Sequence, residues 1–101
     1  MNKEFENHVA VITGAGVGIG FEIARLLCAR GASVILNDVD TKLCNEASGK
    51  ITKEGGNCVS LPSDAGDLKS IETLVETAVK KFGKLTLCIP NAGITLFSDF
   101  L

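Results

Sequence analysis

A glycine-rich stretch near the amino end constrains the fold of this chain more than any other feature. Residues 9–24 read VAVITGAGVGIGFEIA, so four glycines fall between a β-branched run and a segment with helical spacing. Glycine tolerates positive φ angles, and its missing Cβ lets a ligand approach the backbone. A helix that starts at such a turn presents free N–H groups and the positive end of its dipole to anions. The stretch therefore predicts a phosphate-binding crossover from a strand to a helix.

Short apolar runs and helical periods alternate along the rest of the chain. The expected strands cover 9–13, 33–38, 57–64 and 85–90. The expected helices cover 18–30, a segment capped by Asp40 or Thr41 that ends at Gly55, and a segment capped by Asp67 that ends at Gly83. Helical crossovers between buried strands are typical of a parallel sheet with right-handed connections. We expect an α/β fold in one small domain.

The first helix is expected to carry one apolar stripe, formed by Ile19, Ile23, Leu26 and Leu27. Glu72 and Glu76 are four residues apart and could be read as paired carboxylates, but helical spacing places them away from the apolar stripe of their helix. A solvated face is the better interpretation for this pair.

The cysteines and the charge exclude several classes of function. Cys28, Cys44, Cys58 and Cys88 form no C-x-x-C pair and His8 is the sole histidine, so we expect free, mostly buried thiols and no metal site. A net charge of −2 argues against a nucleic-acid partner. The sequence shows no apolar run long enough for a membrane span and no signal peptide, which leaves a cytoplasmic location as the expectation.

An acidic residue at the end of the second expected strand points to a particular dinucleotide. Asp38 follows Gly18 by about 20 residues, a spacing at which a carboxylate accepts hydrogen bonds from the hydroxyls of an adenosine ribose. The same carboxylate would repel a 2′-phosphate, and Val17 offers no positive charge to such a phosphate. The sequence therefore favours NAD over NADP.

Together these residues resemble the short-chain dehydrogenase/reductase family. Its T-G-x-x-x-G-x-G motif matches residues 13–20 at every fixed position, and Asp38 is similar to its NAD-selecting acid. Asp64 and Ala65 resemble the family's pair at the adenine, and residues 91–93 match its N-A-G motif, although Pro90 stands where the family usually has asparagine. The resemblance implies the following cofactor-binding residues: Gly14, Gly16, Val17, Gly18, Ile19, Gly20, Asp38, Asp64, Ala65, Asn91, Ala92 and Gly93.

The resemblance also sets expectations for fold and activity. Residues 1–101 would be the dinucleotide-binding half of a single Rossmann-type domain, a doubly wound parallel sheet with strand order 3-2-1-4. The parent protein would be an NAD(H)-dependent oxidoreductase that acts on a small alcohol or carbonyl substrate, as a homo-oligomer. The family's catalytic asparagine, serine and Tyr-x-x-x-Lys pair lie beyond residue 101, and the chain has no tyrosine. We therefore assign no catalytic residue here and expect the chain alone to be inactive.

A second hypothesis stays open beside the first. If the short chain is the native product, it would be a non-catalytic nucleotide-binding or interaction module. The apolar segment LTLCI at 85–89 would then form an open sheet edge, and such edges pair with another chain or aggregate.

Overall fold

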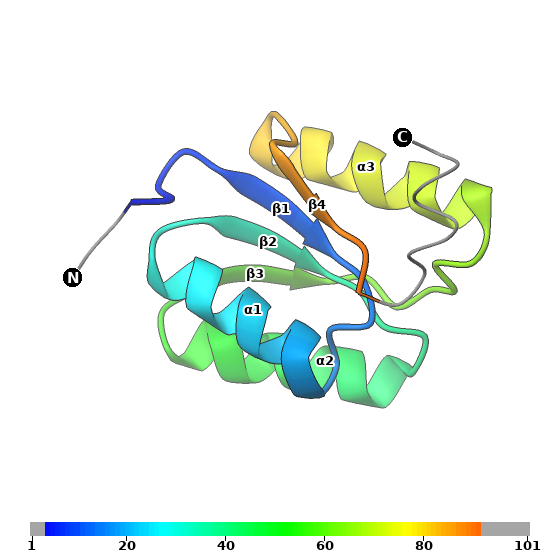
Figure 1. Ribbon diagram of the computed structural model, residues 1–101, viewed down its shortest axis with the longest axis horizontal. Helices are drawn as coiled ribbons and strands as arrows, with labels where there is room; N and C mark the ends of the chain where they lie inside the picture. The colour runs from blue at the N-terminus through cyan, green and yellow to red at the C-terminus, as the bar shows by residue number, and fades with distance from the viewer. Residues whose placement is uncertain (1–3, 92–101) are drawn as a thin grey trace.

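Four short parallel strands, with helices packed against both faces, make up the computed structural model, which describes residues 4–91 (Figure 1). The strands lie in the order β3-β2-β1-β4, which confirms the expected doubly wound, Rossmann-like sheet. The elements in chain order are β1 (Val9–Ile12), α1 (Gly18–Ala29), β2 (Ser33–Leu36), α2 (Thr41–Lys53), β3 (Asn57–Ser60), α3 (Leu68–Phe82) and β4 (Leu87–Ile89).

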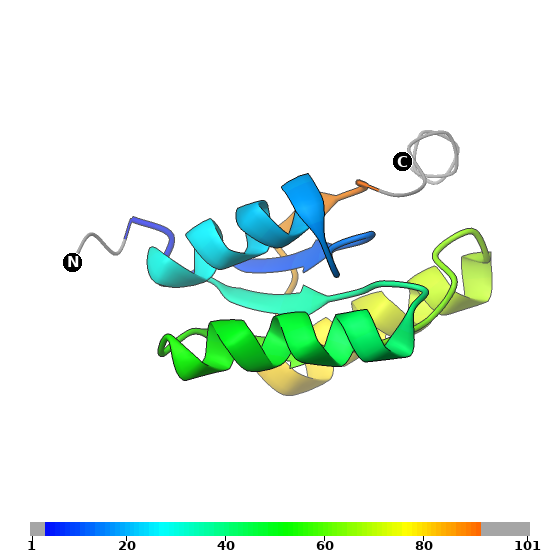
Figure 2. The ribbon, with the colours of Figure 1, turned by 90° about the horizontal axis from the view of Figure 1, so that it is seen from below.

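The alternation of side chains along β1 divides the core into two layers. Ala10 and Ile12 face α1 and α2, whereas Val9 and Val11 face α3. Figure 2 shows β1 and β2 between α1 on one side and α3 on the other. Because helices cover both faces, β1 is apolar at every position rather than alternately polar, as is usual for parallel strands.

The strands are shorter than expected at their carboxyl ends. β1 stops at Ile12 and β2 at Leu36, and β3 stops at Ser60 although the sequence pattern continued to residue 64. The residues that follow each strand turn toward one another above the sheet. These turns, not the strands, supply the candidate site.

Both later helices begin at the aspartates that the sequence indicated. Asp40 accepts a hydrogen bond from the N–H of Leu43 at 3.0 Å, and Asp67 accepts one from the N–H of Lys69 at 3.0 Å. Each carboxylate occupies one of the donors left free at a helix start. Glu72 and Glu76 are exposed on α3, as expected.

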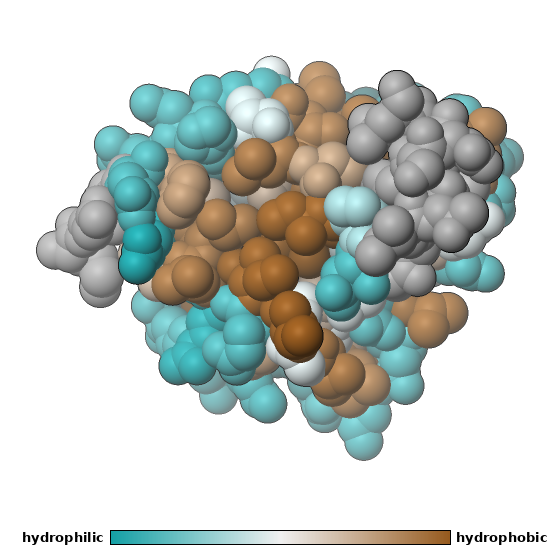
Figure 3. Space-filling view, viewed as in Figure 1, coloured by the Kyte–Doolittle hydropathy of each residue, from teal (hydrophilic) through white to brown (hydrophobic). Residues whose placement is uncertain are grey.

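The expected apolar stripe of α1 was wrong in part. Leu27 is buried at 8% exposure, but Ile19 and Leu26 are 75% and 53% exposed. The face of α1 that meets the sheet contains mainly small residues: Gly20, Ala24, Leu27 and Cys28. Small side chains let the helix backbone approach the strands closely, so Ile19 and Leu26 lie beside the contact, whereas Ile23 packs partly buried against the core. Figure 3, in the view of Figure 1, shows hydrophobic residues exposed on the side of the molecule where α1 lies.

Candidate cofactor-binding site

The turns after the strands meet at one edge of the sheet, because parallel strands all end on the same side. They enclose a hollow with a volume of about 240 Å³. Its walls come from the turns after β1, β2 and β3, through Gly14, Asn37, Asp38, Val39, Ser63, Asp64, Ala65 and Gly66. The hollow thus brings together four residues of the predicted site: Gly14, Asp38, Asp64 and Ala65.

Asp38 links the turn after β2 to the glycine-rich turn. Its Oδ2 accepts a hydrogen bond from the N–H of Gly16 at 2.9 Å, and its Oδ1 accepts one from the N–H of Asp40 at 3.0 Å. The two bonds fix the carboxylate at the wall of the hollow.

The start of α1 is open above its backbone. Val17 occupies the N-cap position without a side-chain hydrogen bond, in contrast to the aspartates that cap α2 and α3. Gly18 has a φ of +67°, and apart from its two chain neighbours and the backbone of its own helix no atom lies within 4 Å of the position that a Cβ would take there. The first N–H groups of the helix therefore have neither a side-chain cap nor a bulky neighbour above Gly18, which is the arrangement that binds a diphosphate.

Asn91 holds the other side of the glycine-rich turn. Its side-chain amide donates to the carbonyl oxygen of Gly14 at 3.0 Å. A Cβ on Gly20 would lie 2.7 Å from the same amide nitrogen and 2.7 Å from the Gly14 oxygen. Glycine at position 20 therefore lets α1, the turn after β1 and the turn after β4 pack against each other.

The remaining predicted residues lie around the hollow or outside the described part of the chain. The side chain of Val17 is exposed at the N-cap of α1. Ile19 borders a separate apolar depression together with Ile23 and Leu26. Ala92 and Gly93 lie outside the described residues.

Asp64 shapes its own turn. Its Oδ1 accepts a hydrogen bond from the N–H of Gly66 at 2.8 Å, and its carbonyl oxygen accepts one from the N–H of Asp67. These bonds keep Ala65 buried against the hollow. A short acidic side chain at this place therefore serves the local backbone as well as any ligand.

Asn37 was missed by the sequence analysis, although it joins two walls of the hollow. Its side chain is 1% exposed, and its Nδ2 lies within hydrogen-bonding distance of Leu61 O (3.0 Å), Ser63 O (3.1 Å) and Ser63 Oγ (3.0 Å). Its carbonyl oxygen accepts from the N–H of Ala15 at 2.8 Å. The available signal was an amide at the end of a fully apolar run, directly before the acidic residue.

The chemistry of the hollow is acidic. Asp38 and Asp64 contribute carboxylates, and none of the residues that line it is basic. Beneath it, the thiol of Cys44 donates to the carbonyl oxygen of Leu36, and burial raises the pKa of that thiol.

The described residues contain no group of three side chains suited to a metal ion. In the same part of the chain, no helix is both long and apolar enough to cross a bilayer.

Comparison with known proteins identifies relatives that share this architecture. The chain is 40% identical over 86 residues to an uncharacterised oxidoreductase of Bacillus subtilis, an alignment that covers 85% of this chain and 34% of the relative. It is 37% identical over 94 residues to a cyclohexanol dehydrogenase of Acinetobacter, with 93% and 38% of the two chains covered. The chain thus spans less than two fifths of the length of these relatives.

A solved structure agrees with the sequence comparison. A hydroxysteroid dehydrogenase from Escherichia coli superposes with a TM-score of 0.82 at 33% identity, over 89% of this chain and 40% of that one. The family model described as short chain dehydrogenase matches residues 8–101. This family uses a nicotinamide cofactor, NAD or NADP, which agrees with an open helix start beside a carboxylate. The chain belongs to the short chain dehydrogenase family.

Proposed function

We propose that this chain forms the NAD(H)-binding part of an oxidoreductase that interconverts an alcohol and a carbonyl compound. The observation that carries the proposal is the Asp38 carboxylate, held by the N–H of Gly16 at the wall of the hollow. The nicotinamide ring of the bound cofactor supplies or accepts the hydride. The residues of this chain bind and orient the cofactor.

The hollow, the start of α1 and the turn after β4 would hold different parts of the dinucleotide. The N–H groups at the start of α1, around Gly18 and Ile19, would bind the diphosphate. Asp38 would accept hydrogen bonds from the ribose hydroxyls. Asp64 and Ala65 would contact the adenine, and residues 91–93 would line the path toward the nicotinamide.

The preference for NAD rests on charge. A 2′-phosphate bound beside Asp38 would face a carboxylate at short range, and no lysine or arginine lines the hollow to offset the repulsion. The hydroxyl groups of an unphosphorylated ribose would donate hydrogen bonds to the same carboxylate. The site therefore discriminates between the two cofactors by both attraction and repulsion.

We further propose that the parent protein acts on a small alcohol or carbonyl substrate, as a homo-oligomer in the cytoplasm. We assign no catalytic residue to this chain, and we expect residues 1–101 alone to show no turnover. The relatives' names, which include a cyclohexanol dehydrogenase, are consistent with the substrate class.

Calorimetric titration of the chain with NAD⁺ and with NADP⁺ tests the proposal. We expect NAD⁺ to bind more tightly than NADP⁺ by at least about tenfold. In Asp38→Asn, which keeps the size of the side chain and an oxygen for the N–H of Gly16, the preference should fall toward unity. Tighter binding of NADP⁺ by the unaltered chain, or an unchanged preference in Asp38→Asn, would contradict the proposal.

A second candidate function is favoured by a specific observation. β4 pairs with β1 alone among the described strands, and its other edge has no neighbouring strand there. A non-catalytic nucleotide-binding or interaction module would use this edge to pair with another chain. Sedimentation of the chain across a range of concentrations tests the self-associating form of this second function, because a chain that stays monomeric throughout does not pair with itself through β4.

A further inference from the structure

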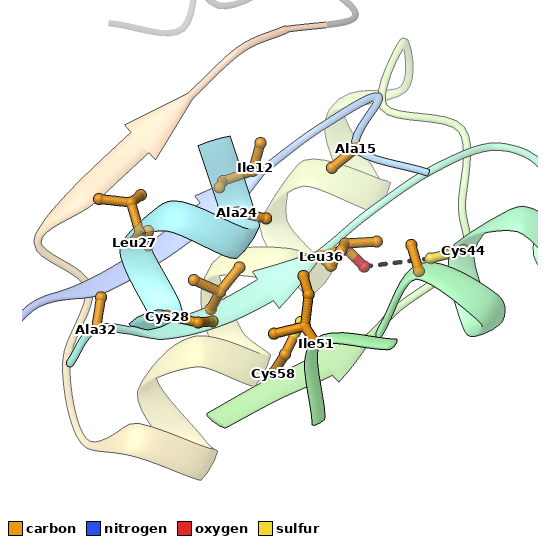
Figure 4. Packing of buried hydrophobic residues seen from close by; sticks show 13 residues of the cluster. Ile12, Ala15, Ala24, Leu27, Cys28, Ala32, Leu36, Cys44, Ile51 and Cys58 are labelled. Carbon is orange, nitrogen blue, oxygen red and sulfur yellow. Dashed lines mark hydrogen bonds between the residues drawn. The ribbon is translucent and has the colours of Figure 1, made fainter. Parts of the chain in front are cut away.

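Asn37 is a buried polar side chain at the wall of the candidate cofactor site. Leu36, directly before it, packs in the core cluster between the sheet and the helices α1 and α2, and its carbonyl oxygen accepts from the thiol of Cys44 at 3.2 Å (Figure 4). Successive side chains of a strand point to opposite faces, so the side chain of Asn37 points away from that cluster. It is 1% exposed and lines the hollow.

Hydrogen bonds on two sides hold Asn37 in place. Its backbone N–H donates to the carbonyl oxygen of Ile12 at 2.9 Å, and its own carbonyl oxygen accepts from the N–H of Ala15 at 2.8 Å. On the other side, its Nδ2 lies 3.0 Å from the carbonyl oxygen of Leu61 and 3.1 Å from that of Ser63. Carbonyl oxygens can only accept, so they place the amide nitrogen, and not the amide oxygen, on the side of the turn after β3.

The side-chain oxygen of Asn37 has no partner in this arrangement. Among the described residues no hydrogen bond reaches its Oδ1. In the same part of the chain, every fully buried side-chain nitrogen or oxygen atom has a partner, so this unpartnered oxygen must be accessible. Because Asn37 is almost completely buried and lines the hollow, its accessible oxygen faces the hollow. The wall of the hollow therefore offers a hydrogen-bond acceptor to a ligand.

The surroundings of this oxygen favour a donor group on the ligand. Asp38 and Asp64 line the same hollow, and their carboxylates are acceptors as well. Asp38 is bonded to the glycine-rich turn, whereas the amide of Asn37 is bonded to the turn after β3. That second turn carries the residues that would contact the adenine. Adenine has an exocyclic amino group, a donor, where hypoxanthine and guanine have a carbonyl oxygen, an acceptor.

We propose that the Oδ1 of Asn37 accepts a hydrogen bond from the exocyclic amino group of adenine and thereby selects adenine over purines with a carbonyl oxygen at that place. The inference rests on the proposed function, since it takes a dinucleotide as the ligand of the hollow. A hypoxanthine base would set one acceptor against another and leave the buried amide oxygen unpaired. Asp64 contributes less to this choice, because its side chain is exposed and water satisfies its carboxylate without the base.

Calorimetric titration of the chain with NAD⁺ and with nicotinamide hypoxanthine dinucleotide tests the proposal. The two ligands differ only in the purine base. We expect the unaltered chain to bind NAD⁺ about tenfold more tightly than the hypoxanthine dinucleotide. In Asn37→Ala the ratio of the two affinities should fall to near unity. A loosened turn would weaken the binding of both ligands alike, so the ratio reports the contact with the base.

Asn45→Ala is the matched control for this substitution. Asn45 carries the same side chain on α2, where its Oδ1 accepts from the Oγ of Ser60 at 2.7 Å, and it does not line the hollow. The ratio of affinities should therefore stay at the value of the unaltered chain. A ratio near unity in the unaltered chain, an unchanged ratio in Asn37→Ala, or an equal loss in Asn45→Ala would each overturn the proposal.

Heteronuclear NMR of the unaltered chain gives a second readout that decides the question if Asn37→Ala fails to fold. The side-chain amide signals of Asn37 should shift on saturation with NAD⁺ and shift much less on equal saturation with the hypoxanthine dinucleotide. Equal shifts would contradict the contact. Failure of both dinucleotides to bind would overturn the proposed function together with this inference, whereas NAD⁺ binding without a preference for the base would overturn this inference alone.

Discussion

The Asp38 carboxylate and the backbone N–H of Gly16 are joined by a hydrogen bond of 2.9 Å across 22 positions of sequence. The bond ties the turn after β2 to the glycine-rich turn after β1. A Cβ on Gly16 would lie 2.8 Å from the Oδ2 of Asp38, so only glycine leaves room for the carboxylate in this position. One reason for glycine at position 16 is therefore the approach of a side chain of the protein, in addition to any approach of a ligand.

Gly16→Ala should displace the Asp38 carboxylate from the wall of the hollow. The added methyl group overlaps a side chain that two backbone bonds hold in place, and overpacking of this kind costs about 1–3 kcal/mol. We expect a lower free energy of unfolding in urea and weaker NAD⁺ binding in a calorimetric titration.

Gly49→Ala is the matched control for this substitution. Gly49 lies within α2, and no atom lies within 4 Å of its Cβ position. Alanine there should raise the free energy of unfolding by about 0.5–1 kcal/mol and leave NAD⁺ binding unchanged. Equal effects of the two substitutions would show that the contact with Asp38 is unimportant.

Asn37→Ala should loosen two walls of the hollow together. The substitution leaves the partly buried carbonyl oxygens of Leu61 and Ser63 without their amide donor, which costs about 1–3 kcal/mol. Urea unfolding measures the loss of stability, and limited proteolysis between residues 61 and 66 measures the loosening of the turn. A stability within about 0.5 kcal/mol of the unaltered chain would contradict this role.

Leu26→Ala and Leu27→Ala form a pair of neighbouring substitutions that tests which face of α1 meets the sheet. Leu27 is buried at 8% exposure, and its truncation should cost about 2–5 kcal/mol. Leu26 is 53% exposed, so its truncation should change the free energy of unfolding by no more than about 0.5 kcal/mol. Thermal unfolding followed by circular dichroism ranks the two, and the reverse order would show that α1 is rotated about its axis.

Asp40→Ala should destabilise α2 at its first turn. The carboxylate accepts from the N–H of Leu43, and removal of an N-cap of this kind costs about 1 kcal/mol. Asp40→Asn is the control, because its side-chain oxygen still accepts the same bond. Equal unfolding midpoints for the alanine and asparagine variants would contradict the capping role.

The sequence predicted the elements well because their signals are local. Apolar runs bounded by glycine, helical spacing and aspartate caps act within a few residues, so the cap at Asp67 could be read directly and the cap of α2 could be narrowed to Asp40 or Thr41. The sequence also indicated four residues that line the hollow, Gly14, Asp38, Asp64 and Ala65, since the turn after a strand is contiguous in sequence. Asn37 could not be found in this way, because its partners Leu61 and Ser63 lie 24 and 26 positions away.

The order of apolar and polar residues, with glycine where the chain must turn, determined the order of strands and helices along this chain. The motifs in the same stretches indicated the family to which it belongs. Tertiary structure alone decided which face of α1 is buried and how the Asp38 carboxylate meets Gly16. These two facts depend on how closely the helices approach the sheet. That distance is set by many side chains packing together, and no single stretch of sequence contains it.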